Sequence, residues 1–195
     1  MRALIRELIE TAILALLIFI ALQASVQNFR VEGSSMEPTL KGGQYLLVNK
    51  LVYFNLSPGD LRRLLPFNAV DRSETLFAFH APRHGEIIVF HFPRDQTRDF
   101  VKRVIAVAGD EVEIRRGTVF VNGQSLDEPY ITHPSEASMA RLIVPPESFF
   151  VLGDNRRASN DSRDWGPVPA ENVVGRAWVS YWPLNQFSTL LTFWP

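Results

Sequence analysis

A serine in a short turn and a lysine in an apolar strand are the two residues of this chain that can combine into a hydrolytic site. Ser35 lies in GSSMEPTL, residues 33–40, and Lys102 lies in DFVKRVIAVAGD, residues 99–110. A serine hydroxyl is a weak nucleophile until a neighbouring base removes its proton, and a lysine can be that base only while its amine is neutral. The chemistry therefore requires Lys102 to lie in dry surroundings beside Ser35.

The strand pattern around Lys102 indicates such surroundings. Alternate side chains of a strand share a face, so we expect Phe100, Lys102 and Val104 to point to the same side. Apolar neighbours disfavour the ammonium form and lower the pKa of the amine. A shift from about 10.4 to 7 or 8 costs roughly 3–5 kcal/mol. The alternative is an edge-strand lysine whose ammonium reaches water, and this stretch alone favours that alternative.

The turn around Ser35 favours the hydrolytic site over a lysine that reaches water. Gly33 permits unusual backbone angles just before the serine, and Pro38 fixes the backbone just after it. Such a turn can present a hydroxyl clear of its neighbours and aim backbone N–H groups at a developing oxyanion. Taken alone, Ser35 is equally compatible with an ordinary loop serine or with the cap of a short helix that begins near Glu37.

Composition excludes several classes of function. The chain has 195 residues, enough for one compact domain with an appendage, and 20 basic residues against 21 acidic ones. A net charge of -1 argues against nucleic acid as a partner. There are no cysteines, and His80, His84, His91 and His133 lack the spacing of metal ligands. No glycine-rich phosphate or dinucleotide loop occurs. We therefore expect no metal and no cofactor.

The remaining pattern predicts a mainly β fold, an antiparallel sheet or barrel-like catalytic domain. Short apolar runs bounded by turn residues are typical of strands. The predicted strands span residues 44–54, 85–93, 100–109, 110–116, 118–123, 149–154 and 176–183. Arg116-Gly117 and Asn122-Gly123 each offer a glycine for a hairpin turn. Residues 55–82 interrupt this series as an insertion without a role that the sequence indicates, and LRRLLPF within it could form one helical turn.

The N-terminal segment predicts a single-pass membrane anchor at residues 8–28. Glu10 is its only charge, and about 20 apolar residues of helix cross a bilayer. A cleavable signal peptide and a buried core helix are the alternatives. Arg2 and Arg6 favour a cytoplasmic N-terminus, residues 1–7, with the β-rich domain, residues 29–195, on the outer side. The aromatic C-terminal tail, residues 182–195, either touches lipid or closes the core as a final strand.

Four segments together resemble the signature boxes of the bacterial-type signal peptidase I (leader peptidase) family, which are membrane-bound Ser/Lys endopeptidases. SMEPTL, GEIIVFHFP, DFVKRVIAVAGD and VLGDNRRASNDSRDWGPVPAENVVGRA occur in the family's order, and the resemblance spans residues 29–177. It implies removal of N-terminal signal peptides from exported preproteins after a small residue, of the Ala-X-Ala type. The implied partners are preproteins carrying signal peptides and the lipid bilayer, and no nucleic acid. A monomer is expected.

The family's roles carry over onto matching positions. The resemblance implies that Ser35 is the nucleophile, that Lys102 is the general base and that Ser159 orients the lysine amine through a hydrogen bond. Asp161 and Arg163 match a structural ion pair. The positions that match the shallow apolar substrate pockets are Phe29, Val31, Phe100 and Val101. Strict strand alternation would separate the last two of these.

One position departs from the pattern. Some members have an oxyanion-hole serine two residues before the nucleophile, where this chain has Gly33, which leaves the Ser35 N–H and the Ser34 hydroxyl as candidate donors. Two other functions stay open on the residues alone. One is a membrane-anchored β protein that binds peptides without catalysis, and the other is a Ser/Lys peptidase that cuts itself or a regulator. The expected location is the plasma membrane, with an internal membrane such as the thylakoid as the alternative.

Overall fold

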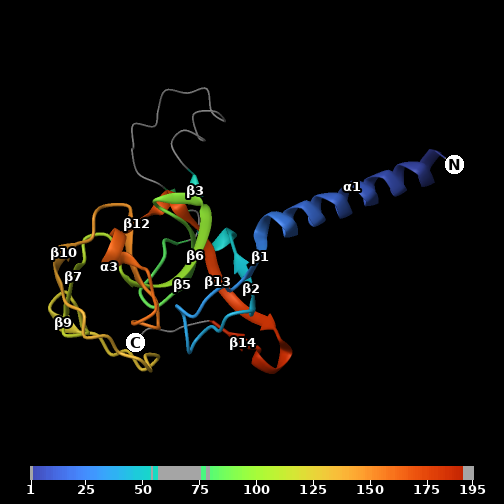
Figure 1. Ribbon diagram of the computed structural model, residues 1–195. Helices are drawn as coiled ribbons and strands as arrows, with labels where there is room; N and C mark the ends of the chain where they lie inside the picture. Colours follow the sequence, from blue (N-terminus) through green and yellow to red (C-terminus); the bar gives the residue numbers. More distant parts are fainter. Residues whose placement is uncertain (1, 54, 57–75, 78–79, 191–195) are drawn as a thin grey trace, which may run out of the picture.

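The computed structural model describes residues 2–53, 55–56, 76–77 and 80–190. A single long helix, α1 (Arg2–Ser25), projects from a body built of antiparallel strands (Figure 1). The prediction of a mainly antiparallel β domain behind one N-terminal helix is therefore confirmed.

The largest sheet has eight strands and carries most of the predicted site. Its order is β1-β2-β13-β5-β6-β11-β12, and β14 pairs with β13. The strands are β1 (Val26–Arg30), β2 (Tyr45–Asn49), β5 (Ile87–Phe92), β6 (Asp95–Ala106), β11 (Ser148–Leu152), β12 (Val168–Pro169), β13 (Val173–Trp182) and β14 (Ser188–Thr189). β2 and β13, which are far apart in the sequence, are neighbours in this order.

A second sheet lies beside the first and has the order β10-β7-β8-β9 (Figure 1). Its strands are β7 (Glu111–Arg115), β8 (Thr118–Val121), β9 (Gln124–Ser125) and β10 (Met139–Ile143). Both predicted hairpin turns are confirmed, because Arg116-Gly117 joins β7 to β8 and Asn122-Gly123 joins β8 to β9. All four turn residues have positive φ, between 46° and 84°, as such two-residue turns require.

Short elements complete the described part of the chain. They are the two-stranded pair β3 (Asn55–Leu56) and β4 (Leu76–Phe77), the helix α3 (Ser162–Trp165), and the 3-10 turns η1 (Leu51–Tyr53), η2 (Ala170–Asn172) and η3 (Leu184–Gln186). The pair β3–β4 belongs to the predicted insertion at 55–82. Most of that insertion, including LRRLLPF, lies outside the described residues.

Several element boundaries differ from the sequence prediction, and two of these differences have a local cause. The predicted strand at 44–54 ends at Asn49, whose side-chain oxygen accepts hydrogen bonds from the N–H groups of Leu51 and Val52 at 2.9 and 3.2 Å. This local cap turns the chain into η1. The predicted anchor helix at 8–28 ends at Ser25, because Val26 already pairs with Asn49 as the first residue of β1.

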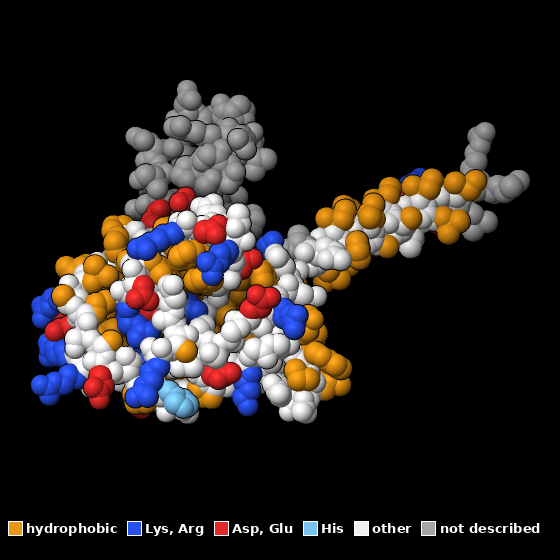
Figure 2. Space-filling view, viewed as in Figure 1, with side chains coloured by type: hydrophobic (Ala, Val, Ile, Leu, Met, Phe, Trp, Pro, Cys, Tyr) orange, Lys and Arg blue, Asp and Glu red, His pale blue; other side chains and the backbone are white. Residues whose placement is uncertain are grey.

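The apolar side chains of α1 are not covered by the β body. Leu8 is 69% exposed and Leu22 is 63% exposed, and Figure 2 shows hydrophobic side chains along the helix. Within the described residues, no helix has the combination of length and apolar character that crossing a membrane requires. The anchor stays a prediction.

The C-terminal tail closes the core in part. β14 pairs with β13, and Leu190 is buried in the same cluster as Met36 and Leu40. Other side chains of this region are exposed, and Figure 2 shows hydrophobic atoms gathered where β13 ends. The large exposed apolar residues here are Trp178, Trp182, Leu184 and Phe187.

Candidate active site

The turn that carries Ser35 is fixed by apolar residues that flank the serine. Met36 and Leu40 are buried beneath the turn, against β2, and Leu40 donates a backbone hydrogen bond to Met36 O at 2.8 Å. Burying two such side chains stabilises a fold by about 1.5–3 kcal/mol each. Gly33 has φ 78°, which favours glycine. Ser35 itself is half-buried at the surface of the turn, and no helix begins there.

Lys102 lies on β6 with its amine against Ser35. Nζ donates to Ser35 Oγ at 2.8 Å and to the backbone oxygen of Val101 at 3.0 Å. The side chain is only 4% exposed, and Nζ is 5.3 Å from the centre of the Phe100 ring. The structure therefore brings together the two residues that the sequence paired across 67 positions, and the alternative in which the Lys102 ammonium reaches water is wrong.

Burial also sets the charge state of this amine. Loss of hydration lowers the pKa of Lys102 from 10.5 to about 8, although the nearby carboxylates of Asp161 and Asp154 oppose the shift. A pKa near 8 leaves a substantial neutral fraction at mildly alkaline pH. The lysine is thus a competent base for the hydroxyl that it contacts.

A cleft of about 690 Å³ opens beside the dyad. All four predicted pocket residues line it, and they come from two segments: Phe29 and Val31 at the end of β1, and Phe100 and Val101 on β6. Ser35 and Lys102 line the same cleft. The cleft therefore combines these four apolar side chains with the hydroxyl and the amine of the dyad, and Arg30 and Asp99 are among its polar lining residues.

The register of β6 explains how neighbouring residues reach one cleft. β11 pairs with β6 only from Arg103 to Ala106, so among the described strands the part of β6 before Arg103 has β5 alone as a neighbour. At a free edge, side chains of both faces border the same opening. Simple alternation therefore does not separate Phe100 from Val101 here.

Ser159 does not make the predicted hydrogen bond to Lys102. Its Oγ is buried without a partner among the described residues, while the amine donates to Ser35 and to the Val101 carbonyl. The hydroxyl lies instead against Gly153, where an added Cβ would be 2.2 Å from it. The expectation that Ser159 holds the amine directly is thus wrong for this structure, although Ser159 lies in the loop beside the dyad.

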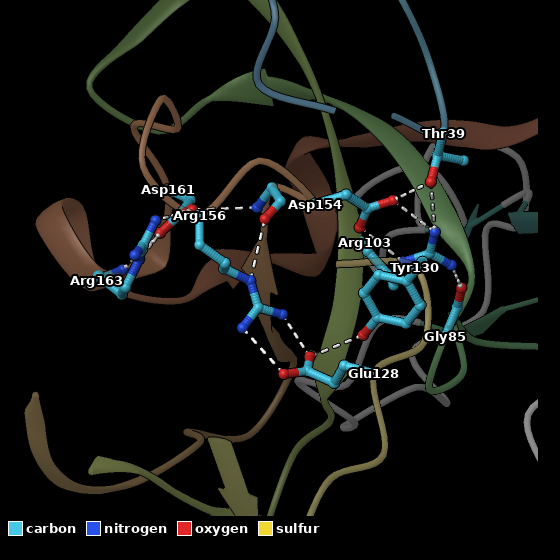
Figure 3. Close-up of polar contacts among 10 residues, drawn as sticks. Thr39, Gly85, Arg103, Glu128, Tyr130, Asp154, Arg156, Asp161 and Arg163 are labelled. Atoms are coloured by element: carbon cyan, nitrogen blue, oxygen red, sulfur yellow. Dashed lines mark hydrogen bonds and ion pairs between the residues drawn. The ribbon is translucent and has the colours of Figure 1, made fainter. Parts of the chain in front are cut away.

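Asp161 and Arg163 form an ion pair at the start of α3. Arg163 donates from Nε and Nη2 to the Asp161 carboxylate at 2.7 and 2.8 Å (Figure 3). The carboxylate is fully buried, caps α3 and accepts from the Gly153 N–H at 3.0 Å. One carboxylate therefore ties the helix start to the loop that approaches Ser35.

Sequence reasoning missed the contacts that hold this loop to the serine turn. Asn155 donates from its backbone N–H to Ser35 O at 3.0 Å and from its side chain to Ser34 O at 3.1 Å. Gly153 packs so closely that a Cβ there would lie 2.4 Å from Ser35 O. The motif GDN looks like an ordinary turn in the sequence, and only the tertiary contact reveals its role.

A second missed feature is the buried guanidinium next to Lys102. Arg103 is 1% exposed and donates to both oxygens of Asp154 at 2.8 and 2.6 Å. Thr39, in the serine turn, donates to the same carboxylate at 2.5 Å (Figure 3). A charged residue in the middle of the apolar run VKRVIAVA was the available signal, because a buried arginine needs a partner.

Two of the described histidines each contact one carboxylate. His84 lies 2.7 Å from Asp110, and His91 lies 2.6 Å from Asp99. Among the residues that the structure describes, no group of three or more potential metal ligands occurs.

Comparison with known proteins identifies the family of this chain. The family model of signal peptidase, peptidase S26, matches residues 5–182. Signal peptidase I of Leptolyngbya laminosa is 35% identical over 94% of this chain and 83% of its own length. Signal peptidase I of Bacillus caldolyticus is 36% identical over 83% of this chain and 82% of its own. A crystal structure of a signal peptidase I from Enterococcus faecalis is 33% identical, covers 50% of this chain and 97% of its own, and has a TM-score of 0.45. Because the family model covers most of the chain and these relatives match it over most of their length, this chain belongs to the signal peptidase family, peptidase S26.

Proposed function

We propose that Ser35 is the nucleophile and Lys102 the general base of a signal peptidase I. Neutral Lys102 takes the Ser35 proton as Oγ attacks the scissile carbonyl, and the ammonium so formed protonates the leaving amine. Water activated by the same lysine then hydrolyses the acyl-enzyme. The observation that carries the proposal is the 2.8 Å contact between Oγ and an amine that is 4% exposed.

The substrate is an extended segment of a preprotein that carries a signal peptide. We assign the small-residue specificity to the cleft lined by Phe29, Val31, Phe100 and Val101, whose apolar walls suit alanine side chains. The free edge of β6 before Arg103 offers backbone groups to which an extended peptide can add as a further strand. Residues just before the cut then lie over Phe100 and Val101, with their scissile carbonyl at Ser35.

The tetrahedral intermediate needs donors near Ser35. We assign the first to the Ser35 N–H and the second to the Ser34 hydroxyl, since Gly33 supplies no side chain. Asn155 supports this arrangement because it holds the carbonyls of both serines, and so fixes the peptide groups of the turn. Ser159 and the Asp161–Arg163 pair contribute by holding the adjacent loop.

The membrane is the second partner. We propose that residues 8–28 anchor the protein in the plasma membrane, or in an internal membrane such as the thylakoid, with residues 1–7 in the cytoplasm. The exposed leucines and isoleucines of α1 support this assignment, because the β body leaves them uncovered. The catalytic domain then acts as a monomer on the outer side, with Trp182 and Phe187 in contact with lipid. Anchoring raises the local concentration of membrane-held substrates.

The test is cleavage of a preprotein by the purified protein in detergent. The wild type should release the mature protein after an Ala-X-Ala sequence, and Ser35→Ala and Lys102→Arg should fold and release none. Substantial cleavage by Ser35→Ala would refute the assignment of the nucleophile. A folded wild type that binds the preprotein without cutting it would favour the non-catalytic alternative.

A further inference from the structure

A buried ion pair outside the cleft connects the second sheet to the active-site loop. Glu128, three residues after β9, accepts hydrogen bonds from Nη1 of Arg156 at 3.1 Å and from its Nη2. Tyr130 OH donates to the same carboxylate at 2.8 Å. The side chains of Arg156 and Glu128 are 3% and 9% exposed, so both charges lie out of water and depend on one another (Figure 3).

The first arm of this arrangement leads from Glu128 to Ser35. Arg156, while held by Glu128, donates from Nε to the backbone oxygen of Gly153 at 3.1 Å. Asn155, between these two residues, donates to Ser35 O at 3.0 Å. The carboxylate of Glu128 therefore holds the Arg156 side chain, and Arg156 holds residues 153–155. These residues in turn hold the turn that carries Ser35.

The second arm leads from Tyr130 to the same loop. The guanidinium of Arg103 lies 3.9 Å from the centre of the Tyr130 ring, a cation–π contact that covers the guanidinium from outside. Arg103 binds Asp154, and Asp154 in turn accepts from Thr39 in the nucleophile turn at 2.5 Å. Both arms reach residues 153–155 from one segment, residues 126–131.

We infer that Glu128 is a positioning residue for the Ser35–Lys102 dyad and that segment 126–131 acts as a strap across the active-site loop. The inference rests on the proposed function, because it assigns the strap a part in the same reaction. Neither Glu128 nor Arg156 lines the cleft, and neither do residues 153–155, although Ala158 and Asn160 farther along the same loop do. Because the contacts of the strap lead to residues 153–155, loosening it should misplace the dyad and change substrate binding much less.

The experiment compares Glu128→Gln with Glu113→Gln in peptide cleavage. Glu113 pairs with Arg115 through two hydrogen bonds of 2.8 and 2.5 Å, but Arg115 is 58% exposed and the pair is remote from the loop. Because a displacement of about 1 Å can cost 10²-fold, we expect Glu128→Gln to lower kcat roughly 10- to 100-fold with KM within about twofold. The matched Glu113→Gln should leave both constants unchanged. All assays are run well below the melting temperature measured for each variant.

Arg156→Lys is the second variant, used also if Glu128→Gln fails to fold. It keeps the buried positive charge but loses the fork that spans Glu128 and Gly153 O. We expect a kcat loss of the same order, again without a KM change. The inference is overturned if the folded variants have a kcat within twofold of wild type, or if only their KM is changed. Wild type and Ser35→Ala run alongside, so failure of wild-type cleavage counts against the proposed function and not against the strap alone.

Discussion

Replacing Lys102 by methionine should stabilise the protein at neutral pH and lose that advantage in alkali. The pKa of Lys102 is lower in the folded protein than in the unfolded chain. At pH values between these two pKa values the unfolded chain binds more protons, so the free energy of unfolding rises with pH there. For Lys102 the window runs from about 8 to 10.5. Methionine has a similar shape and no charge to desolvate, so it removes this dependence.

The magnitude follows from the displaced pKa of the buried amine. A shift from 10.5 to about 8 corresponds to about 3 kcal/mol below pH 8, at about 1.36 kcal/mol per unit. The substitution also removes the hydrogen bonds to Ser35 Oγ and to the Val101 carbonyl, each contributing about 1 kcal/mol. The loss of these two hydrogen bonds does not depend on the protonation of Lys102 in the unfolded chain. The change of the stability difference with pH therefore reports the shifted pKa alone.

The assay is urea unfolding of full-length wild type and Lys102→Met in the same detergent, at pH 6 and at pH 11. The difference in unfolding free energy between the two proteins should change by about 3 kcal/mol between these pH values, in favour of the variant at pH 6. Other groups titrate equally in both proteins and cancel. A difference that is the same at both pH values would refute the buried, destabilised amine.

Three further predictions concern the same site. The kcat/KM of the wild type should rise with pH and reach half its maximum near pH 8. The Asp161 carboxylate raises the pKa of Lys102, so Asp161→Asn should move that midpoint to lower pH. A midpoint that stays or moves to higher pH contradicts this prediction. Gly153→Ala would place a Cβ 2.2 Å from Ser159 Oγ, so it should destabilise the protein by about 1–3 kcal/mol in thermal unfolding and lower kcat. A variant with the stability and kcat of the wild type would show that the contact is not tight. Substrates with phenylalanine in place of alanine before the cut should not be cleaved, and equal turnover would remove the small pocket.

The sequence predicted the parts of the site that depend on local pattern. Strand alternation gave Lys102 apolar neighbours, although that stretch alone favoured an amine in water, and the Gly33–Pro38 frame indicated an accessible hydroxyl at Ser35. Their contact followed from family resemblance, because no local rule pairs residues 67 positions apart. The hairpins at Gly117 and Gly123 followed from turn chemistry alone.

The parts that the sequence did not predict depend on tertiary register. The free edge of β6, which lets Phe100 and Val101 share one cleft, exists because β11 stops pairing at Arg103. Strand β10 was missed, since MARLI does not alternate apolar with polar residues and its burial does not alternate either. The pairing of Glu128 with Arg156 joins two loops 28 positions apart, and neither loop has a pattern that identifies its partner.

The most direct test of the Ser/Lys chemistry is an NMR titration of the lysine side chains in detergent-solubilised protein labelled at lysine Cε. The chain has three lysines, Lys41, Lys50 and Lys102, so three signals are expected, and Lys102→Met identifies the one of interest. The Lys102 signal should titrate with a midpoint near pH 8. A Lys102 midpoint above pH 10 would mean that the amine is charged at working pH and cannot take the Ser35 proton.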